Sequence, residues 1–413
     1  MAILRPFKAL RPKAGLAASV LAPPYDVMDR AEAKAMAGEN ARSFLHVTRA
    51  EIDLPDETDA YSARVYEKSK ENLAGFLRNG VLVRDEEPRL YIYRQTADGR
   101  MQTGLVGCFS VDEYENGAIK RHERTRVEKE RDRIRHFDAC DADTEPVFLA
   151  YRADATVAGL TDDWTGAHAP AYDFVSADGV GHALWPVDDD AVIAALVAAF
   201  ARLDTLYIAD GHHRSASAYK VGLMRRESHA GFDGTEEFNF FMAVAFPSSE
   251  LRIFDYNRVV RDLAGLSVSA FLAEVEKRFT VESLGTARCA PREKHCFGMF
   301  LAGAWYALRA REDLVPQDVI GALDVSILQD NLLAPVLGVK DPRADKRIDF
   351  VGGIRGLAEL ERRVRTDMSV AFSLCPVSIA DLFAAADSGL IMPPKSTWFE
   401  PKPGSGLFVH ELS

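Results

Sequence analysis

Cysteine is scarce in this chain, and the few cysteines lie far apart. There are five among 413 residues, and no two of them form a Cys-x-x-Cys pair. Disulfide-stabilised secreted domains and zinc-binding folds depend on closely spaced cysteines, so this distribution argues against both. It is typical of a protein of the reducing cytoplasm, where thiols stay unpaired. The five are Cys108, Cys140, Cys289, Cys296 and Cys375.

Long apolar runs and an excess of basic residues are also missing. No stretch approaches the roughly 18 consecutive apolar residues of a membrane-spanning helix, and the first residues lack the apolar core of a secretion signal. With 50 Lys and Arg against 62 Asp and Glu, the formal net charge is −12. Non-specific nucleic-acid binding needs a basic face, so this balance argues against it. We expect a cytoplasmic protein with no membrane partner and no nucleic-acid partner.

The stretch around which the chain is organised covers residues 206–219, LYIADGHHRSASAY. A short apolar run ends at Asp210 and Gly211, and a helical pattern is established by Ser215 and continues to about residue 226. At a junction of strand, tight turn and helix, the first helical N–H groups point outward and the helix dipole favours an anion. Gly211 lets the backbone come close to such a ligand. The turn is therefore a candidate phosphate-binding site.

The polar residues His212, His213 and Arg214 occupy the first turn of this helix. A guanidinium can hold a phosphate by two hydrogen bonds, and an imidazole can donate or shuttle a proton. The alternative is an ordinary Asp-Gly turn followed by a solvated loop. The density of titratable groups favours a site, because four of the five residues from Asp210 to Arg214 can bind or transfer something in a chain with only 10 histidines.

A second charged cluster covers residues 122–133, HERTRVEKERDR. By default such a run forms a solvated helix face with Glu–Arg pairs. Its basic residues would also make a local surface suited to phosphate in an otherwise acidic protein, with Arg133 as one contact. In that interpretation His122 and Glu123 supply an acid and a base. The residues alone leave both interpretations open.

A rigid loop near the start of the chain presents another carboxylate. The prolines of Pro23-Pro24-Tyr25-Asp26 fix this loop, because proline cannot extend a helix or a sheet here. Asp26 is either a catalytic carboxylate or the cap of a helix that starts near Arg30.

Near the other end of the chain, residues 392–403 are rich in proline and lysine. Such a segment is too rigid for a random tail, and we expect it to form a clamp ordered against the body of the protein. Lys395, Ser396 and Thr397 within it are a candidate anion-binding trio.

Strand patterns and helix patterns alternate along the chain and predict an α/β (α+β) fold with mixed sheets and flanking helices. Residues 43–49 are predicted to form a strand, and residues 90–95 and 102–111 a hairpin around Asp98-Gly99. No linker stands out. The expected division is an N-terminal region 1–200, a central region 201–340 and a C-terminal region 341–413, with one continuous domain as the alternative.

Six motifs taken together resemble the domain of unknown function (DUF) 1015 family, which genomes sometimes label SerC-like. The label SerC-like implies phosphoserine aminotransferase, but no lysine-centred pyridoxal phosphate signature is evident, so we expect no pyridoxal phosphate. The family label itself implies no established reaction. The motifs are Pro6–Pro12, Pro23–Val27, His122-Glu123 with Thr125, Lys129-Glu130 with Asp132-Arg133, Ile208–Arg214, and Met392–Thr397 with Pro401-Lys402.

The turn from Asp210 to Arg214 also resembles, more distantly, the Gly-x-His-Arg phosphate-binding turn of the ParB and sulfiredoxin superfamily. Members of that superfamily bind nucleotides and include free-serine kinases. The resemblance implies that Gly211, His213 and Arg214 hold phosphates, within a ParB/sulfiredoxin-like core around residues 206–226. This chain has no cysteine in the turn and no evident helix-turn-helix, so sulfinic-acid reduction and DNA partitioning are not expected.

The favoured hypothesis is a nucleotide-dependent phosphotransferase, or a nucleotide hydrolase, that acts on a small metabolite such as a hydroxyl amino acid. ATP, ADP or CTP with Mg²⁺ would serve as the cofactor, and no resident metal site is expected. The alternatives are a non-catalytic sensor of a phosphorylated metabolite or nucleotide, and a metal-dependent hydrolase built on His122, His212 and His213. The oligomeric state stays open. Candidate catalytic residues are Glu123, Asp26, His213 and His122, and candidate phosphate-binding residues are Asp210, Gly211, His212, His213, Arg214, Arg133, Lys395, Ser396 and Thr397.

Overall fold

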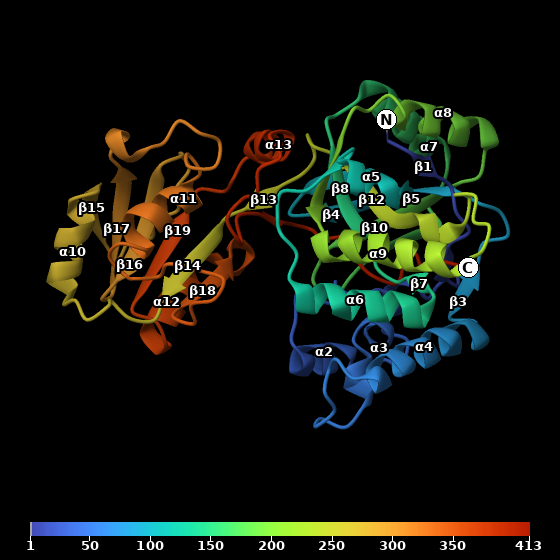
Figure 1. The fold of residues 1–413 in the computed structure, drawn as a ribbon, viewed down its shortest axis with the longest axis horizontal. Coiled ribbons are helices and arrows are strands. Elements are labelled where there is room, and N and C mark those ends of the chain that lie inside the picture. Colours follow the sequence, from blue (N-terminus) through green and yellow to red (C-terminus); the bar gives the residue numbers. More distant parts are fainter. Residues whose placement is uncertain (1) are drawn as a thin grey trace. The chain divides into compact units, whose positions relative to one another are not determined.

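The computed structural model describes residues 2–413, and this chain divides into two compact units (Figure 1). Unit 1 comprises residues 2–251 together with Pro401–Ser413, and unit 2 comprises Arg252–Glu400. The boundaries expected after residues 200 and 340 do not coincide with this division. The last segment belongs with the N-terminal part through long-range backbone pairing, which local composition does not reveal.

Unit 1 is built on a nine-stranded mixed sheet. Its strands follow the order β6-β11-β8-β12-β5-β4-β10-β9, and β1 pairs with β5. The pairs β11–β6 and β12–β8 are parallel, and the remaining pairs are antiparallel. The strands are β1 (Leu4–Arg5), β4 (Leu90–Ala97), β5 (Arg100–Ser110), β6 (Ile119–Lys120), β8 (Val147–Tyr151), β9 (Tyr172–Val175), β10 (Gly181–Val187), β11 (Leu206–Asp210) and β12 (Phe240–Pro247).

Helices and two short strand pairs complete unit 1. Helix α6 packs against both α4 and α9, and strand β21 near the end of the chain pairs with β7. The remaining elements are β2 (Leu10–Pro12), β3 (Leu82–Arg84), β7 (Ala142–Asp143), β21 (His410–Glu411), α1 (Ala17–Val20), α2 (Arg30–Ala37), α3 (Leu45–Thr48), η1 (Ala50–Asp53), α4 (Ala63–Arg78), α5 (Val111–Asn116), α6 (Val127–Cys140), α7 (Ala155–Ala167), α8 (Asp190–Phe200), α9 (His212–Ser228) and η2 (Glu237–Asn239).

Two local predictions for unit 1 have different outcomes. The hairpin is confirmed, because β4 and β5 are antiparallel and joined by Asp98 and Gly99, both with positive φ. The strand predicted over residues 43–49 is wrong. Phe44 accepts hydrogen bonds from the N–H groups of Val47 and Thr48, and the segment forms the helical turn α3 with Phe44 fully buried. A short apolar run is ambiguous between strand and helix, and packing decides it here.

Unit 2 is built on a six-stranded antiparallel sheet in the order β15-β17-β16-β19-β14-β18. Trp305 is fully buried, and its indole N–H donates to Glu361 at 3.0 Å, so the large ring is both packed and hydrogen-bonded. The elements are β13 (Ile253–Phe254), β14 (Tyr256–Val260), α10 (Val268–Glu276), β15 (Phe279–Gly285), β16 (Cys296–Leu301), β17 (Ala304–Ala310), η3 (Glu312–Leu314), α11 (Asp324–Leu328), η4 (Gln329–Leu333), β18 (Ile348–Gly352), η5 (Gly353–Arg355), α12 (Gly356–Thr366), β19 (Val370–Leu374), α13 (Ile379–Asp387) and β20 (Trp398–Phe399).

The two sheets and their helices confirm the predicted α/β class with mixed sheets and flanking helices. Across residues 2–413, no helix is both long enough and apolar enough for a membrane crossing.

Candidate functional site

The strand, turn and helix predicted around residues 206–226 are present as β11, Gly211 and α9. Residues 206–209 are buried between β6 and β8, so their apolar side chains fix the strand in the sheet. The pairing of β11 with β8 shifts register between Ile208 and Asp210. A bulge of this kind re-aims the side chain that follows it, which here is the carboxylate of Asp210.

Gly211 is required by the shape of the turn. Its φ is +93°, which L side chains rarely adopt, and a Cβ there would lie 3.1 Å from Cζ of Arg214. The missing side chain therefore lets the guanidinium of Arg214 fold back over the turn. Gly211 also provides no capping side chain for α9, so the start of this 17-residue helix keeps its partial positive charge.

Asp210 connects two cations from distant parts of the chain. Its Oδ2 accepts from Nη2 of Arg214 at 2.7 Å, and its Oδ1 accepts from Nζ of Lys402. Burial alone would raise the pKa of Asp210, but the charges of Lys402 and Arg214 lower it to about 2. Asp210 is therefore a carboxylate at neutral pH and forms ion pairs with both cations.

Arg214 is 3% exposed, and both of its terminal nitrogens bond within the protein. One donates to Asp210 and the other to the carbonyl of Pro146, while Nε has no partner among the described residues. Arg214 thus stabilises the turn by linking Asp210 to the backbone at Pro146. Its predicted phosphate contact stays a prediction, for which the unpartnered Nε is the available donor.

His122 and His212 form a buried pair whose rings meet edge to face, with centroids 4.6 Å apart. Burial and the neighbouring ring lower the pKa of His122 to about 3, although Glu123 opposes the shift. Burial likewise lowers the pKa of His212 to about 3 despite the charge of Asp210. Both imidazoles are neutral at physiological pH. They can donate or accept a hydrogen bond there, and Nε2 of His212 has no partner among the described residues.

His213 joins the starts of two helices. Its Nε2 accepts from the backbone N–H of Arg126, the cap residue of α6, at 3.0 Å, which places the proton of the neutral ring on Nδ1. Glu123 lies in the half-buried loop just before this cap. The structure therefore brings the predicted residues 122–123 and 210–214 together.

The loop that carries Asp26 belongs to the same neighbourhood. Asp26 is exposed. Burial would lower the pKa values of Lys402 and Arg214, but the charge of Asp210 and, more weakly, that of Asp26 raise both, with Glu145 also raising the pKa of Arg214. The loop is anchored by the backbone N–H of Tyr25, which donates to Glu145 at 2.9 Å. Its side chain is therefore available to a ligand beside the two cations.

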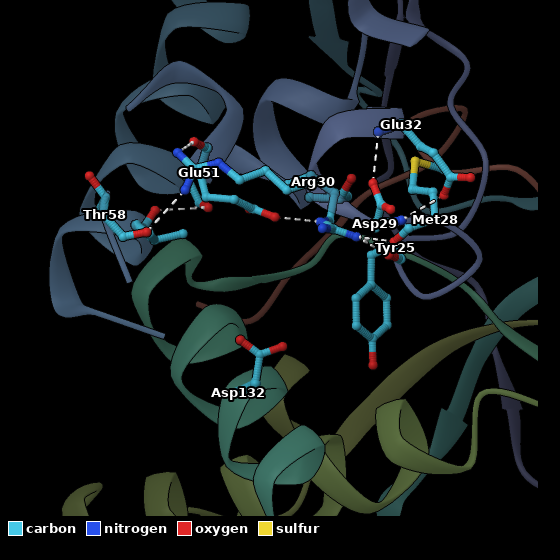
Figure 2. Close-up of polar contacts among 12 residues, drawn as sticks. Tyr25, Met28, Asp29, Arg30, Glu32, Glu51, Thr58 and Asp132 are labelled. Carbon is cyan, nitrogen blue, oxygen red and sulfur yellow. Dashed lines mark hydrogen bonds and ion pairs between the residues drawn. The ribbon is translucent and has the colours of Figure 1, made fainter. Parts of the chain in front are cut away.

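The alternative role of Asp26 as a helix cap is wrong. Asp29 caps α2 by accepting from the N–H of Glu32 at 2.9 Å, and Glu32 accepts from the N–H of Asp29 at 2.9 Å (Figure 2). Arg30, the first residue of α2, donates to backbone carbonyls that include those of Glu51 and Thr58 (Figure 2). The cap needs an extended residue directly before the helix, and Asp26 lies too early in the chain.

The run 122–133 is only partly the solvated surface that its charges predict. Arg124, Arg126 and Arg131 are exposed. Arg133 points inward and is 4% exposed, because its face of α6 packs in the interior of unit 1. The prediction that Arg133 contacts phosphate at the surface is therefore wrong, because its side chain is buried.

Buried Arg133 instead links the loop of Asp26 to α6. It donates to Asp132 at 2.9 and 3.0 Å and to Glu145 at 3.4 Å, and its guanidinium lies 3.8 Å from the ring centroid of Tyr25. Figure 2 shows the Tyr25 ring pointing toward α6, where Asp132 lies.

Lys402 is the residue that sequence reasoning left out of the site. The side-chain amide of Gln95 donates to the carbonyl of Lys402 at 2.8 Å, and that of Gln102 donates to the carbonyl of Pro401 at 2.9 Å. Two strands of the sheet thus hold the segment that delivers this ammonium group to Asp210. The available signal was a lysine between two prolines, Pro401 and Pro403, whose rigidity suits a fixed contact.

A family model described as a protein of unknown function, DUF1015, matches residues 4–326, most of the chain. The chain belongs to the DUF1015 family. No curated protein matches this DUF1015 chain significantly.

Several solved structures show a low likeness to the DUF1015 chain. A free serine kinase in complex with AMP is 12% identical, with a TM-score of 0.36 over 71% of this chain and 86% of that chain. A conserved hypothetical protein from Pyrococcus furiosus is 13% identical, with a TM-score of 0.36 over 74% and 95%. SbnI with a C-terminal truncation, from Staphylococcus aureus, is 11% identical, with a TM-score of 0.39 over 74% and 87%. Likenesses this low carry no argument about function, and the ParB and sulfiredoxin likeness of the turn stays a prediction.

The predicted trio Lys395, Ser396 and Thr397 lies in unit 2 of the DUF1015 chain. Lys395 is exposed, and its Nζ is 5.6 Å from the ring centroid of Tyr256. The hydroxyl of Ser396 donates to the carbonyl of Pro393 at 2.7 Å, so it is engaged within its own turn. A role for the trio in phosphate binding stays a prediction.

The sequence also offers His122, His212 and His213 as candidate metal ligands. Over residues 2–413, no three His, Cys, Asp or Glu side chains gather in a group that could hold a metal ion. The metal-dependent hydrolase built on His122, His212 and His213 therefore lacks a ligand set in the described chain.

Proposed function

We propose that this DUF1015 protein is a cytoplasmic nucleotide-dependent phosphotransferase that acts on the hydroxyl group of a small metabolite, such as a hydroxyl amino acid. The observation that carries the proposal is the convergence of Lys402, Arg214 and the start of α9 on Asp210, with the exposed carboxylate of Asp26 acting on both cations. Phosphoryl transfer depends on fixed positive charge around the phosphates and on a carboxylate near the acceptor, and this site combines the two.

The phosphates would lie against the start of α9. Its unshared N–H groups, the ammonium of Lys402 and the unpartnered Nε of Arg214 supply donors, and the neutral ring of His212 adds another. In this arrangement Asp210 holds the two cations in place, and a bound phosphate would form additional ion pairs with them. Gly211 keeps the backbone open to the ligand.

The acceptor hydroxyl would lie beside Asp26, which takes its proton, with Glu123 as the alternative base. The same two carboxylates fit Mg²⁺, which binds one or two protein carboxylates together with substrate phosphates. Mg²⁺ would neutralise phosphate charge. His122 and His213 would orient the loop before α6 and the first turn of α9.

Calorimetric titration with ADP in the presence of Mg²⁺ tests the binding half of the proposal. The wild-type chain should bind, and Lys402→Gln should weaken binding by about 10-fold to 100-fold, because a hydrogen bond from a charged group contributes about 1.5–3 kcal/mol. Lys13→Gln, at an exposed lysine, is the matched control and should bind like wild type. Absence of binding by the wild type, or equal binding by a folded Lys402→Gln variant, would refute the proposal.

Turnover tests the catalytic half. With ATP, ADP or CTP and a set of hydroxyl amino acids, phosphorus NMR should detect a phosphorylated product. Asp26→Asn should keep ADP affinity and lower kcat by about 10²–10⁴-fold, the usual size of a general-base contribution. Because Asp26 is exposed, the Asp26→Asn variant should fold like the wild type. Glu123→Gln is the companion variant, and it would show the larger loss if Glu123 is the base.

A second candidate is a non-catalytic sensor of a nucleotide or phosphorylated metabolite. It is favoured by the position of Lys402 on the final segment, since a ligand at Asp210 would change how that segment is held. Ligand-dependent protection of residues 392–403 from hydrogen exchange, with no product formed, would support the sensor over the enzyme.

A further inference from the structure

Two cysteines of unit 2 lie at the same end of the paired antiparallel strands β16 and β19, Cys296 as the first residue of β16 and Cys375 just after the end of β19. Strands β16 and β19 pair with Gly298 opposite Ser373 and Phe297 opposite Leu374. Continuing this register by one residue places Cys296 opposite Cys375, which directly follows the end of β19. Opposed residues of an antiparallel pair project from the same face of the sheet, so the two thiols share a face.

The separation implied by this register suits a disulfide. Opposed residues in antiparallel strands have Cα atoms about 4.5–5.5 Å apart, within the roughly 4.4–6.8 Å found in disulfides. Both cysteines are half-buried rather than sealed. Burial raises the pKa of Cys375, and the charges of Asp324 and Cys296 raise it further, which shows that the three groups are close.

Asp324, at the start of α11, is held next to the strand residue before Cys296. It is 6% exposed, and its Oδ1 accepts at 2.7 Å from the backbone N–H of His295, the residue before Cys296. Its Oδ2 has no hydrogen-bond partner among the described residues. Burial raises the pKa of Asp324 to about 7, so a substantial fraction is carboxylate at neutral pH and can accept a thiol proton.

We propose that Cys296 and Cys375 form a redox-reactive dithiol that reacts with a small-molecule disulfide and closes into a cross-strand disulfide. One thiol loses its proton to Asp324, and the thiolate attacks one sulfur of the small disulfide. The S–S bond breaks, and one small thiol leaves. The second cysteine then attacks the mixed disulfide and releases the other small thiol, so that two protein thiols are oxidised and one small disulfide is reduced to two thiols. This chemistry is independent of the nucleotide site of unit 1.

Cys289 is the competing partner. A Cβ on Gly298 would lie 2.8 Å from Cβ of Cys289, and Gly298 shares a face of β16 with Cys296. The register nevertheless favours Cys375, because only Cys375 is directly opposite Cys296.

Peptide mapping of the full chain after reaction with oxidised glutathione decides between the partners. Trypsin separates the three cysteines into peptides 289–292, 295–309 and 366–395, as read from the Lys and Arg positions. We expect 295–309 linked to 366–395, with the intact mass lower by two hydrogen atoms and with buried Cys108 and Cys140 unmodified. A link to 289–292, a glutathione adduct that never resolves, or no reaction by the folded chain would overturn the proposal.

Three variants sharpen the test. Cys289→Ser should still form the cross-link, whereas Cys296→Ser should stop at a glutathione adduct on Cys375. Asp324→Asn should slow cross-linking several-fold at neutral pH, with circular dichroism confirming that it folds. Cross-linking by Asp324→Asn at the wild-type rate would show that Asp324 is not the base. Loss of the cross-link in Cys289→Ser would show that Cys289, and not Cys296 with Cys375, forms the disulfide.

Discussion

Replacing Asp210 by Asn is expected to lower the free energy of unfolding of unit 1 by about 3–5 kcal/mol, because removing one partner leaves buried charge uncompensated. Lys402 and Arg214 would then be two like charges without their shared carboxylate. Urea unfolding followed by circular dichroism, with hydrogen exchange to locate the loss, measures the change. Asp204→Asn, at an exposed position just before β11, is the matched control and should change stability little.

The ion pairs of Asp210 with Lys402 and Arg214 also make the stability of unit 1 depend on pH. The pKa of Asp210 lies at about 2 in the folded chain and at about 3.8 when unperturbed. A lowered pKa contributes stability that is present above the unperturbed value and lost as the pH falls through the folded value. Between about pH 4 and pH 2 the wild type should therefore lose more stability than Asp210→Asn. Equal losses would show that this ion pair contributes nothing.

Asp210→Asn also separates stability from anion binding. Because it releases Lys402 and Arg214 from a competing carboxylate, the variant should bind ADP at least as tightly as the wild type whenever it is folded. Lys402→Gln should weaken that binding. If both variants bind equally poorly, Asp210 itself contacts the ligand, and the assignment of Lys402 and Arg214 as the phosphate-binding groups is wrong.

Replacing His410 by Gln is expected to destabilise the attachment of the last segment by about 3–5 kcal/mol. His410 is 2% exposed, and its Nε2 lies 2.9 Å from Glu237 and its Nδ1 3.4 Å from Asp143. The substitution would leave the buried carboxylate of Asp143 without its cation, and Glu237 would keep only its pair with Arg5 at 2.9 Å. Hydrogen exchange of residues 401–413 measures the loosening, and His229→Gln, at an exposed histidine, is the control.

The contacts of His410 with Asp143 and Glu237 predict that the attachment of the last segment depends on pH in the opposite sense from the ion pairs of Asp210. Burial would lower the pKa of His410, but contacts with Cys108, Asp143 and Glu237 raise it well above its usual value. A raised pKa contributes stability that is complete below about pH 6.5 and is lost as the pH rises through the folded value. Protection of residues 401–413 should therefore fall on the alkaline side in the wild type and stay level in His410→Gln. Because Lys402 lies on this segment, ADP affinity should fall with it.

Local patterns were sufficient for much of the fold and for part of the site. The Asp-Gly turn between an apolar run and a helical pattern predicted β11, Gly211 and α9, because turn chemistry and helix starts depend on neighbouring residues. The hairpin of β4 and β5 was predictable for the same reason. The candidate residues 122–123 and 210–214 also lie together, although only the polar density of each stretch pointed to them.

The structure differs from the local pattern in three places. Residues 43–49 are helical because Phe44 and its neighbours pack from a helical turn. Arg133 is buried because one face of α6 lies in the interior, and a charge run does not tell which residue faces inward. Asp26 is not a cap because the helix begins four residues later, at Arg30, with Asp29 before it.

By itself, the sequence determined that this chain forms strands, helices and the tight turn at Gly211, since these follow from the periodicity and turn chemistry of neighbouring residues. Only the tertiary structure decided that Lys402 reaches Asp210, and that strands β16 and β19 pair in the register that ends with Phe297 opposite Leu374, next to Cys296 and Cys375. Both pairings join residues far apart in the chain. They depend on sheet register and on the backbone contacts that return the last segment to unit 1, and neither is encoded in any short stretch.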